Sequence, residues 1–338
     1  MKALLAFSDL SGGGGRTFAS HLSRAFGPRL ALYSLRRKHE TAQLASALGT
    51  RSESPFSMAL LRVNTLRVIS NSQITALLLC LPFAGRHFYI THGFANGIER
   101  QSRLRQFLFR VQLRLPGTIF VACGDSERDQ LIRLGASQSK VLLVRNAVQA
   151  DCMHFVPRSP DGKTKVLFLG RICYQKGIDI LLQALEKLPD SFHCTIAGDH
   201  QPGEERFVAE VERHINALGS RVRRIPSMTI TVDHLSDFDV CVLPSRFEGL
   251  PYLLLELAAM RMPLIASDCP GNIDIVRSNE HGGSFKTGNS DDLAKALLSF
   301  AGSSREDRAN KSEQLLRLTE AEFRYDKFLD SYAKILGL

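Results

Sequence analysis

The segment DVCVLPSRFEGLPYLLLELAAMRMPLIAS, residues 239–267, contains the pattern that decides the fold. The apolar runs at 240–243 and 264–267 have the length and composition of buried strands, and the stretch 252–260 between them is typical of a helix. A strand, a helix and a second strand in this order predict two parallel strands joined by a crossover helix. We therefore expect a parallel α/β sheet.

The same alternation of strand and helix patterns runs through both halves of the chain. The other expected strands are 1–8, 29–33, 67–71, 87–91, 118–123, 140–144, 165–169, 192–197 and 222–225. The other expected helices are 17–26, 178–188, 204–217, 291–301, 305–318 and 323–336. Prolines and glycine in 149–163 predict a linker between the two series. Two doubly wound domains would place a ligand cleft between their strand ends.

Size and composition fit a two-domain enzyme of 338 residues. The longest apolar stretch, 74–84, is too short to span a bilayer. Residues 1–7 are interpreted as a first strand because Asp9 follows too soon for a signal peptide. The 7 cysteines are scattered singly without a CxxC pair, which indicates buried thiols in a reducing cytoplasm.

Positive charge is concentrated in the first half of the chain. Residues 1–157 hold 20 Lys and Arg against 8 Asp and Glu, whereas residues 158–338 hold 23 against 26. This asymmetry indicates that the first half meets an anionic partner such as a nucleic acid, a phospholipid headgroup or a phosphorylated substrate.

Two glutamates in the opening segment are candidate ligand-binding residues. Glu248 lies in a Gly/Pro loop and Glu256 in an apolar run, where a carboxylate is costly without a partner. Gly249 allows a tight turn, and the helix that follows offers backbone N–H groups to a phosphate. The pair predicts a site in which the two carboxylates bind hydroxyl groups of a polar ligand. The alternatives are a two-carboxylate hydrolase or a structural ion pair of Glu256 with a helix cation.

Two cations follow the first strand of the second half. Arg171 and Lys176 lie in the loop 170–177, before the helix at 178–188. An arginine binds phosphate bidentately and a lysine supplies a point charge, so the pair predicts a phosphate site. Solvated surface cations are the alternative.

Two motifs in the first half are weaker signals. The glycine-rich stretch 11–16 lies between a strand and a helix, where backbone N–H groups can approach an anion; a flexible turn is the alternative. It lacks the Gly-Lys-Ser/Thr of a Walker A loop and the spacing of the dinucleotide fingerprint. His92 ends a strand and has either a structural role or a hydrogen bond to a sugar hydroxyl.

Taken together, these motifs resemble those of the retaining, nucleotide-sugar-dependent glycosyltransferases of family 4, which have the GT-B fold. The motifs occur in the family's order: the glycines 12–15, His92-Gly93, the cations of 170–177, and the E-x7-E pair of Glu248 and Glu256. The likeness covers nearly the whole chain and is strongest over 165–300. The usual Asn-Gly after the inter-domain strand is Asn146-Ala147 here.

The resemblance implies a role for each matched residue. Arg171 and Lys176 would bind the donor diphosphate, Glu256 the ribose and Glu248 the transferred sugar. His92 would lie near the reacting carbon. The remaining implied donor contacts are Gly13, Gly14, Gly15, Gly249, Leu250, Tyr252 and Leu253, with Ile225 and Met228 near the base.

The implied activity is that of a retaining hexosyltransferase with a UDP-sugar as co-substrate and no metal or other cofactor. The acceptor would be a saccharide or a lipid-linked saccharide in lipopolysaccharide, O-antigen or capsule synthesis. Alternatives are a GT-B epimerase and a non-catalytic, membrane-associated sugar-nucleotide-binding protein. The implied domains are an acceptor domain at 1–157, a donor domain at 158–322, and a helix at 323–338 that packs back on the first domain.

A basic amphipathic pattern at 99–115 lies in the expected acceptor domain and is a candidate membrane-binding helix. It carries five arginines among Leu104, Phe107, Leu108 and Val111. Such a helix can lie on an anionic bilayer, or it can be an ordinary helix with its apolar face in the core. We expect a cytoplasmic protein, peripheral on the cytoplasmic face of the inner membrane. No motif supports nucleic-acid binding.

Overall fold

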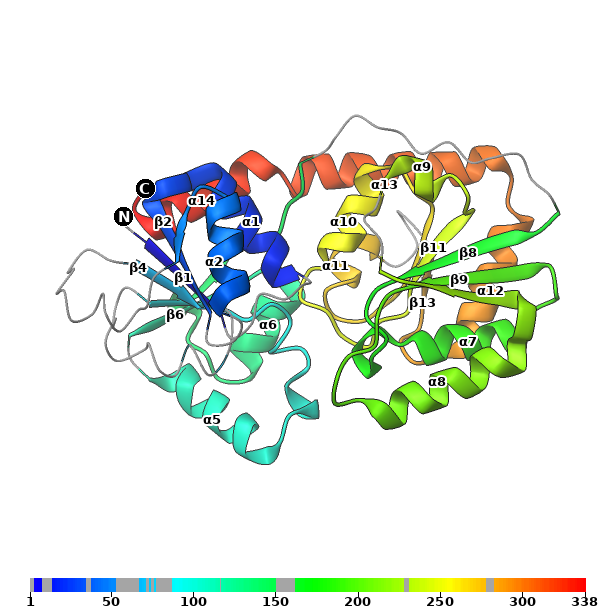
Figure 1. Ribbon diagram of the computed structural model, residues 1–338, viewed down its shortest axis with the longest axis horizontal. Coiled ribbons are helices and arrows are strands. Elements are labelled where there is room, and N and C mark those ends of the chain that lie inside the picture. Colours follow the sequence, from blue (N-terminus) through cyan, green and yellow to red (C-terminus); the bar gives the residue numbers. More distant parts are fainter. Residues whose placement is uncertain are drawn as a thin grey trace. The chain divides into compact units, whose positions relative to one another are not determined.

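The computed structural model describes residues 3–7, 14–34, 38–52, 67–70, 73, 76, 87–115, 117–149, 162–227, 231–277 and 283–338. It divides into two compact units, which are described separately (Figure 1). Unit 1 consists of Met1–Ala147, Gly249–Tyr252 and Tyr325–Leu338, and unit 2 of Val148–Glu248 and Leu253–Arg324. The expected boundary at 157/158, most of the expected linker, Gly13 and Met228 lie outside the described residues.

Unit 1 is built on a seven-stranded sheet in the order β3-β2-β1-β4-β5-β6-β7. Its strands are β1 (Ala3–Phe7), β2 (Leu30–Ser34), β3 (Arg51–Ser52), β4 (Arg67–Ser70), β5 (His87–Ile90), β6 (Thr118–Ala122) and β7 (Val141–Leu143). All neighbouring strands are parallel. In the centre, Leu4 of β1 is in register with Ala31 and Val68, and all three are buried. Burial on both faces explains why these strands are continuously apolar.

Helices cover both faces of this sheet. They are α1 (Gly14–Phe26), α2 (Lys38–Ala47), α5 (Arg103–Arg114), α6 (Asp125–Arg133) and α14 (Tyr325–Leu336). Figure 1 shows α1, α2 and α14 on one face and α5 and α6 on the other. The C-terminal α14 belongs to unit 1 because Tyr332 packs edge-on against Phe18 of α1 at 5.1 Å. Arg67 of β4 also donates to the carbonyl of Ile335 at 2.7 Å.

Unit 2 repeats the architecture with six parallel strands in the order β10-β9-β8-β11-β12-β13. They are β8 (Thr164–Leu169), β9 (Phe192–Ala197), β10 (Val222–Ile225), β11 (Val240–Leu243), β12 (Leu264–Ser267) and β13 (Gly283–Phe285). The helices are α7 (Ile178–Glu186), α8 (Glu205–Leu218), α9 (Val232–Leu235), α10 (Tyr252–Ala259), α11 (Ile273–Val276), α12 (Ser290–Gly302) and α13 (Arg305–Glu322). Figure 1 shows α7, α8 and α12 on one face, where they enclose a buried core with the strands.

The prediction of two doubly wound parallel α/β domains is confirmed, with corrections to the boundaries of two helices and with two strands added. α1 begins at Gly14 rather than residue 17, so two glycines form its first turn. The predicted helix at 99–115 is a 3-10 turn followed by α5, which begins at Arg103 because the Ser102 side chain accepts from the Arg105 amide. The short edge strands β3 and β13 were not predicted.

Candidate functional site

In unit 2, Arg171, Lys176 and Glu248 lie in the segments that follow the carboxyl ends of β8 and β11, and Glu256 lies on α10. These strands are parallel neighbours, so the loops that follow them emerge at the same edge of the sheet. The loop after β8 contains Arg171 and ends in a 3-10 turn, Tyr174–Lys176. The loop after β11 leads to Glu248. The fold thereby brings together residues that are 72 positions apart in the sequence.

Lys176 and Glu248 form a partly buried ion pair. The Lys176 Nζ lies 2.7 Å from Glu248 Oε1, and the Ser245 hydroxyl donates to the same oxygen at 2.7 Å. Gln175 Nε2 lies 3.4 Å from the second carboxylate oxygen, Oε2. The residue Glu248 as a whole is only 5% exposed. The carboxylate is therefore held in one orientation by charge-assisted hydrogen bonds.

A second ion pair, not anticipated from sequence, fixes the two loops to each other. The Arg246 guanidinium binds both carboxylate oxygens of Asp179, at 2.9 and 2.6 Å. It also donates to the Tyr174 carbonyl at 2.9 Å and lies 4.0 Å from the centre of the Tyr174 ring. A bidentate pair with a stacked ring is a rigid contact. Arg246 and Asp179 therefore position Lys176 and Glu248.

Gly177 is required by the close approach of the same two loops. Its φ is +66°, and an added Cβ would lie 2.0 Å from the Pro244 carbonyl oxygen. A side chain is therefore excluded both by backbone conformation and by lack of space.

We predict that Gly177→Ala lowers the free energy of unfolding by about 3 kcal/mol or more, through backbone strain plus the clash. The matched control is Gly203→Ala, where φ is +89° but no atom lies within 4 Å of the added Cβ. The control should lose only about 1–2 kcal/mol. Chemical denaturation of both variants measures the difference, and equal losses would show that the contact with Pro244 is not tight.

Within the parts of the chain that the structure describes, Arg171 and Glu256 lack the partly buried ion pairing that joins Lys176 to Glu248. Arg171 is exposed at the end of β8, and its guanidinium donates to the side chain of Gln201. Glu256 lies on α10 and is partly buried. Its carboxylate has no hydrogen-bond or ion-pair partner among the described residues, so a structural ion pair with a helix cation is not seen there. Burial raises the pKa of Glu256 above its usual value.

The remaining predicted donor contacts fall in both units. Leu253 follows Tyr252 in the first turn of α10, and Ile225 ends β10. Gly249, Leu250 and Tyr252 belong to unit 1, together with Gly14, Gly15 and His92. Gly14 is exposed at the start of α1, and an added Cβ there would meet the Tyr252 ring at an ordinary distance of 3.6 Å.

In unit 1, His92 lies in a strained turn after β5. Its φ is +44°, which is unusual for a residue with a side chain, and its ring packs edge-on against Phe18 at 5.2 Å. Its Nε2 is buried without a hydrogen-bond partner in the described part of the chain. Burial lowers the pKa of His92 to about 4, so the imidazole is neutral at pH 7.

Glu127 holds this turn in place, which sequence reasoning missed. Its fully buried carboxylate accepts from the Thr91 hydroxyl at 2.6 Å and from the Gly93 amide at 2.5 Å. It also accepts from the Cys123 amide and thiol, each at 3.0 Å. These bonds satisfy a carboxylate that burial would otherwise make costly.

The segment Gly249–Leu250 packs onto the same turn. A Cβ on Gly249 would lie 2.7 Å from the Gly93 amide nitrogen and 2.8 Å from the Cys123 thiol. The side chain of Asn146 donates to the Leu250 carbonyl at 2.7 Å. Gly249 is therefore needed for close contact with the His92 turn, in addition to its predicted function in the E-x7-E loop.

We predict that Glu127→Gln lowers the free energy of unfolding by about 2–4 kcal/mol, because a Gln amide group would face donors that now contact a carboxylate. Glu99→Gln, an exposed change in the same unit, should stay within about 0.5 kcal/mol of the parent protein. Thermal and urea unfolding measure both. A Glu127→Gln protein as stable as the control would mean that the carboxylate does not hold the turn.

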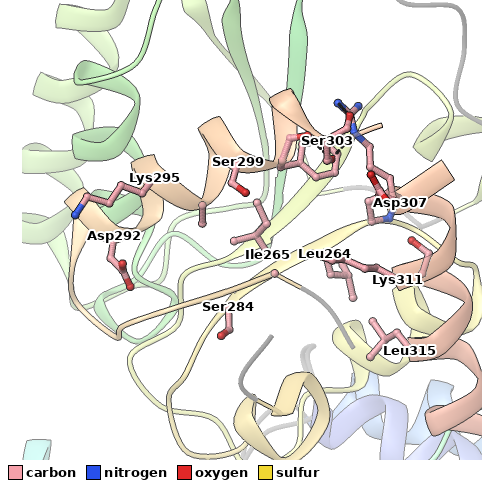
Figure 2. A pocket seen from close by; sticks show the side chains of 16 residues that line it. Leu264, Ile265, Ser284, Asp292, Lys295, Ser299, Ser303, Asp307, Lys311 and Leu315 are labelled. Carbon is pink, nitrogen blue, oxygen red and sulfur yellow. Dashed lines mark hydrogen bonds between the residues drawn. The ribbon is translucent and has the colours of Figure 1, made fainter. Parts of the chain in front are cut away.

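A separate cavity of about 460 Å³ lies along α12 and α13 and the first residues of β12 and β13 (Figure 2). Asp292, Lys295, Asp307 and Lys311 line it. None of the predicted site residues does. It is therefore distinct from the loops at the carboxyl ends of β8 and β11.

The family comparison falls on the unit that contains the cations and both glutamates. Residues 163–302 match the model of the family Glycosyl transferases group 1. The match includes Arg171, Lys176, Glu248 and Glu256 and extends from the start of β8 to the end of α12.

Curated glycosyltransferases are similar to this chain over a larger part of its length. The chain is 24% identical to the Escherichia coli O-antigen biosynthesis glycosyltransferase WbnH over 273 residues, 79% of this chain and 74% of WbnH. It is 24% identical over 226 residues, 62% of this chain and 57% of the relative, to the Campylobacter jejuni N,N'-diacetylbacillosaminyl-diphospho-undecaprenol alpha-1,3-N-acetylgalactosaminyltransferase. It spans about half the length, 51%, of two mycobacterial glycogen synthases.

The crystal structure of Anabaena HepE in complex with UDP and glucose has a TM-score of 0.87 to this chain. The sequence identity is 16%, over 100% of this chain and 99% of HepE. This likeness confirms the GT-B fold.

Proposed function

We propose that this protein is a retaining hexosyltransferase that moves a sugar from a UDP-sugar to a saccharide or lipid-linked acceptor. The observation that carries the proposal is the pairing of Lys176 with the buried Glu248 where the loops after β8 and β11 meet. The exposed Arg171 lies in the same β8 loop. All three residues lie within the segment that matches the glycosyltransferase family.

Each group has a proposed task that suits its surroundings. Arg171 and Lys176 would bind the diphosphate and neutralise the leaving UDP, which leaves no task for a metal ion. Glu256 would accept hydrogen bonds from the ribose hydroxyls, and Glu248 would contact the transferred sugar. Ile225, the last residue of β10, is a proposed contact to the base.

The proposed reaction needs no protein nucleophile. The bond from the sugar's anomeric carbon to the phosphate oxygen breaks, and the acceptor oxygen bonds to that carbon from the same face. The acceptor proton passes to the leaving phosphate. The protein contributes positioning and charge stabilisation. A neutral His92 suits a hydrogen bond to the sugar rather than acid catalysis by an imidazolium.

The names of two relatives support the proposed class of acceptor. WbnH acts in O-antigen biosynthesis, and the name of the Campylobacter enzyme specifies a diphospho-undecaprenol substrate. We infer a place in surface-polysaccharide synthesis, at the cytoplasmic face of the inner membrane. Across the described ranges, no helix is both long enough and apolar enough to cross a bilayer.

The test is a screen of nucleotide sugars with a panel of soluble saccharide and undecaprenyl-diphosphate acceptors, with products followed by mass spectrometry and NMR. We expect UDP release coupled to a product with the donor's anomeric configuration, unchanged by EDTA. A product of opposite configuration would refute retention. Nucleotide-sugar binding without turnover would favour a non-catalytic binding protein, and a new nucleotide sugar without transfer would favour an epimerase.

A further inference from the structure

α5 presents apolar side chains to solvent on one face. Leu104 is 66% exposed, Phe107 62% and Val111 38%. Their spacing of three and four residues places them in one ridge along the helix. Only five large apolar side chains of the described residues are this exposed, and three of them belong to this ridge.

The opposite face of α5 packs into a hydrophobic core of unit 1. Phe109 and Leu113 are buried among aromatic side chains, and the Phe109 ring meets Phe94 edge-on at 5.1 Å. The exposed ridge therefore cannot be explained as the core-facing side of an ordinary domain helix. Exposed apolar side chains gathered in this way mark an interaction surface.

A basic stripe runs beside the ridge. Arg103, Arg110 and Arg114 follow one another at intervals of seven and four residues, which keeps them on one side of the helix. The helix contains no Asp or Glu. None of the three forms an ion pair with any residue that the structure describes.

We propose that this α5 surface, formed by Leu104, Phe107, Val111 and the stripe of Arg103, Arg110 and Arg114, docks on a bilayer that contains anionic lipids. Apolar side chains would enter the headgroup boundary while guanidinium groups bind lipid phosphates. The inference deepens the proposed function because it would bring the enzyme to a lipid-linked acceptor.

Charge favours a bilayer over the other occupants of such a face. A second copy of this chain would place one arginine stripe against another without acidic partners on the helix, which is repulsive. A nucleic acid would use the arginines but leave the apolar ridge uncovered. An anionic bilayer satisfies both parts of the surface at once.

The experiment is flotation of the 338-residue chain with vesicles of phosphatidylcholine alone or with about one quarter phosphatidylglycerol, at low and high salt. We expect binding to the anionic vesicles at low salt, weakened by salt. Leu104→Ser/Phe107→Ser and Arg103→Gln/Arg110→Gln should each lower the bound fraction by at least about tenfold. The matched controls, Leu298→Ser and Arg213→Gln on exposed sites of unit 2, should bind as the parent does.

Membrane binding and catalysis are measured independently, so failure of one proposal can be distinguished from failure of the other. UDP binding and transfer to a soluble saccharide, both measured without vesicles, should be unchanged in the α5 variants. Equal flotation of variants and controls, or no flotation of the parent protein, would overturn the bilayer assignment. A concentration-dependent dimer that is lost in Leu104→Ser/Phe107→Ser would instead assign the surface to a second copy of the chain.

Discussion

Glu248→Gln is expected to lower both stability and transfer activity. The substitution keeps the shape of the side chain but removes the charge that pairs with Lys176 at 2.7 Å. A partly buried ammonium without its anion costs about 1–3 kcal/mol in the free energy of unfolding. The midpoint of thermal unfolding, Tm, should fall by about 2–4 °C for each kcal/mol of stability lost.

Transfer should fall further than stability alone explains, by about 100-fold in kcat, because Glu248 is proposed to contact the transferred sugar. Glu186→Gln is the matched control, since Glu186 pairs with His214 at the surface of the same unit. The control should leave activity unchanged and stability within about 0.5 kcal/mol. A Glu248→Gln enzyme with parental kcat would remove Glu248 from the proposed site.

Glu256→Gln is expected to weaken UDP binding without lowering the stability of the fold. The Glu256 carboxylate has no partner among the described residues, and burial raises its pKa. Neutralising it should leave the free energy of unfolding at pH 7 unchanged or higher. The affinity for UDP should nevertheless fall by about 10- to 100-fold, because a charged hydrogen-bond acceptor for the ribose is lost. Denaturation and calorimetry on the same protein samples measure the two effects.

The raised pKa also predicts the pH dependence of this variant. A carboxyl whose folded pKa exceeds its unfolded pKa contributes stability that is fully present below the unfolded pKa and is lost as pH rises through the folded pKa. The parent protein should therefore lose stability relative to Glu256→Gln as pH rises from about 4. UDP binding by the parent should weaken as pH falls through the folded pKa. A variant that is less stable than the parent at pH 7 would show that the Glu256 carboxylate has a stabilising partner and would contradict the prediction.

Sequence patterns predicted the interior strands of both sheets well because burial on both faces demands continuous apolar runs. The interior strands β9, β11 and β12 begin and end where the sequence indicated, and so does the edge strand β10. The edge strands β3 and β13 have only two and three residues, too few for a periodic signal. The glycines at the start of α1 predicted a loop because their helix propensity is low, whereas the structure continues the helix through them.

The candidate site was predictable only in part. The cations and glutamates could be named, since Arg171, Lys176 and Glu248 lie in recognisable loops and Glu256 in an apolar run. Their partners at distant positions could not be named. Arg246 binds Asp179 across 67 residues, and Glu127 binds the Gly93 amide across 34. Glu127 lies in the first turn of α6, where an acidic side chain ordinarily interacts favourably with the helix dipole. Only the fold shows that its carboxylate is buried under the His92 turn.

Isothermal titration of UDP into the parent protein and Arg171→Ala tests the central proposal most directly, with Arg213→Ala as an exposed-arginine control. We predict saturable binding of one UDP by the parent and the control. Arg171→Ala should weaken the affinity by about 10- to 100-fold, because charge-assisted contacts to the diphosphate are lost. No heat of binding at millimolar UDP, or equal affinity for all three proteins, would contradict a donor site at the carboxyl ends of β8 and β11.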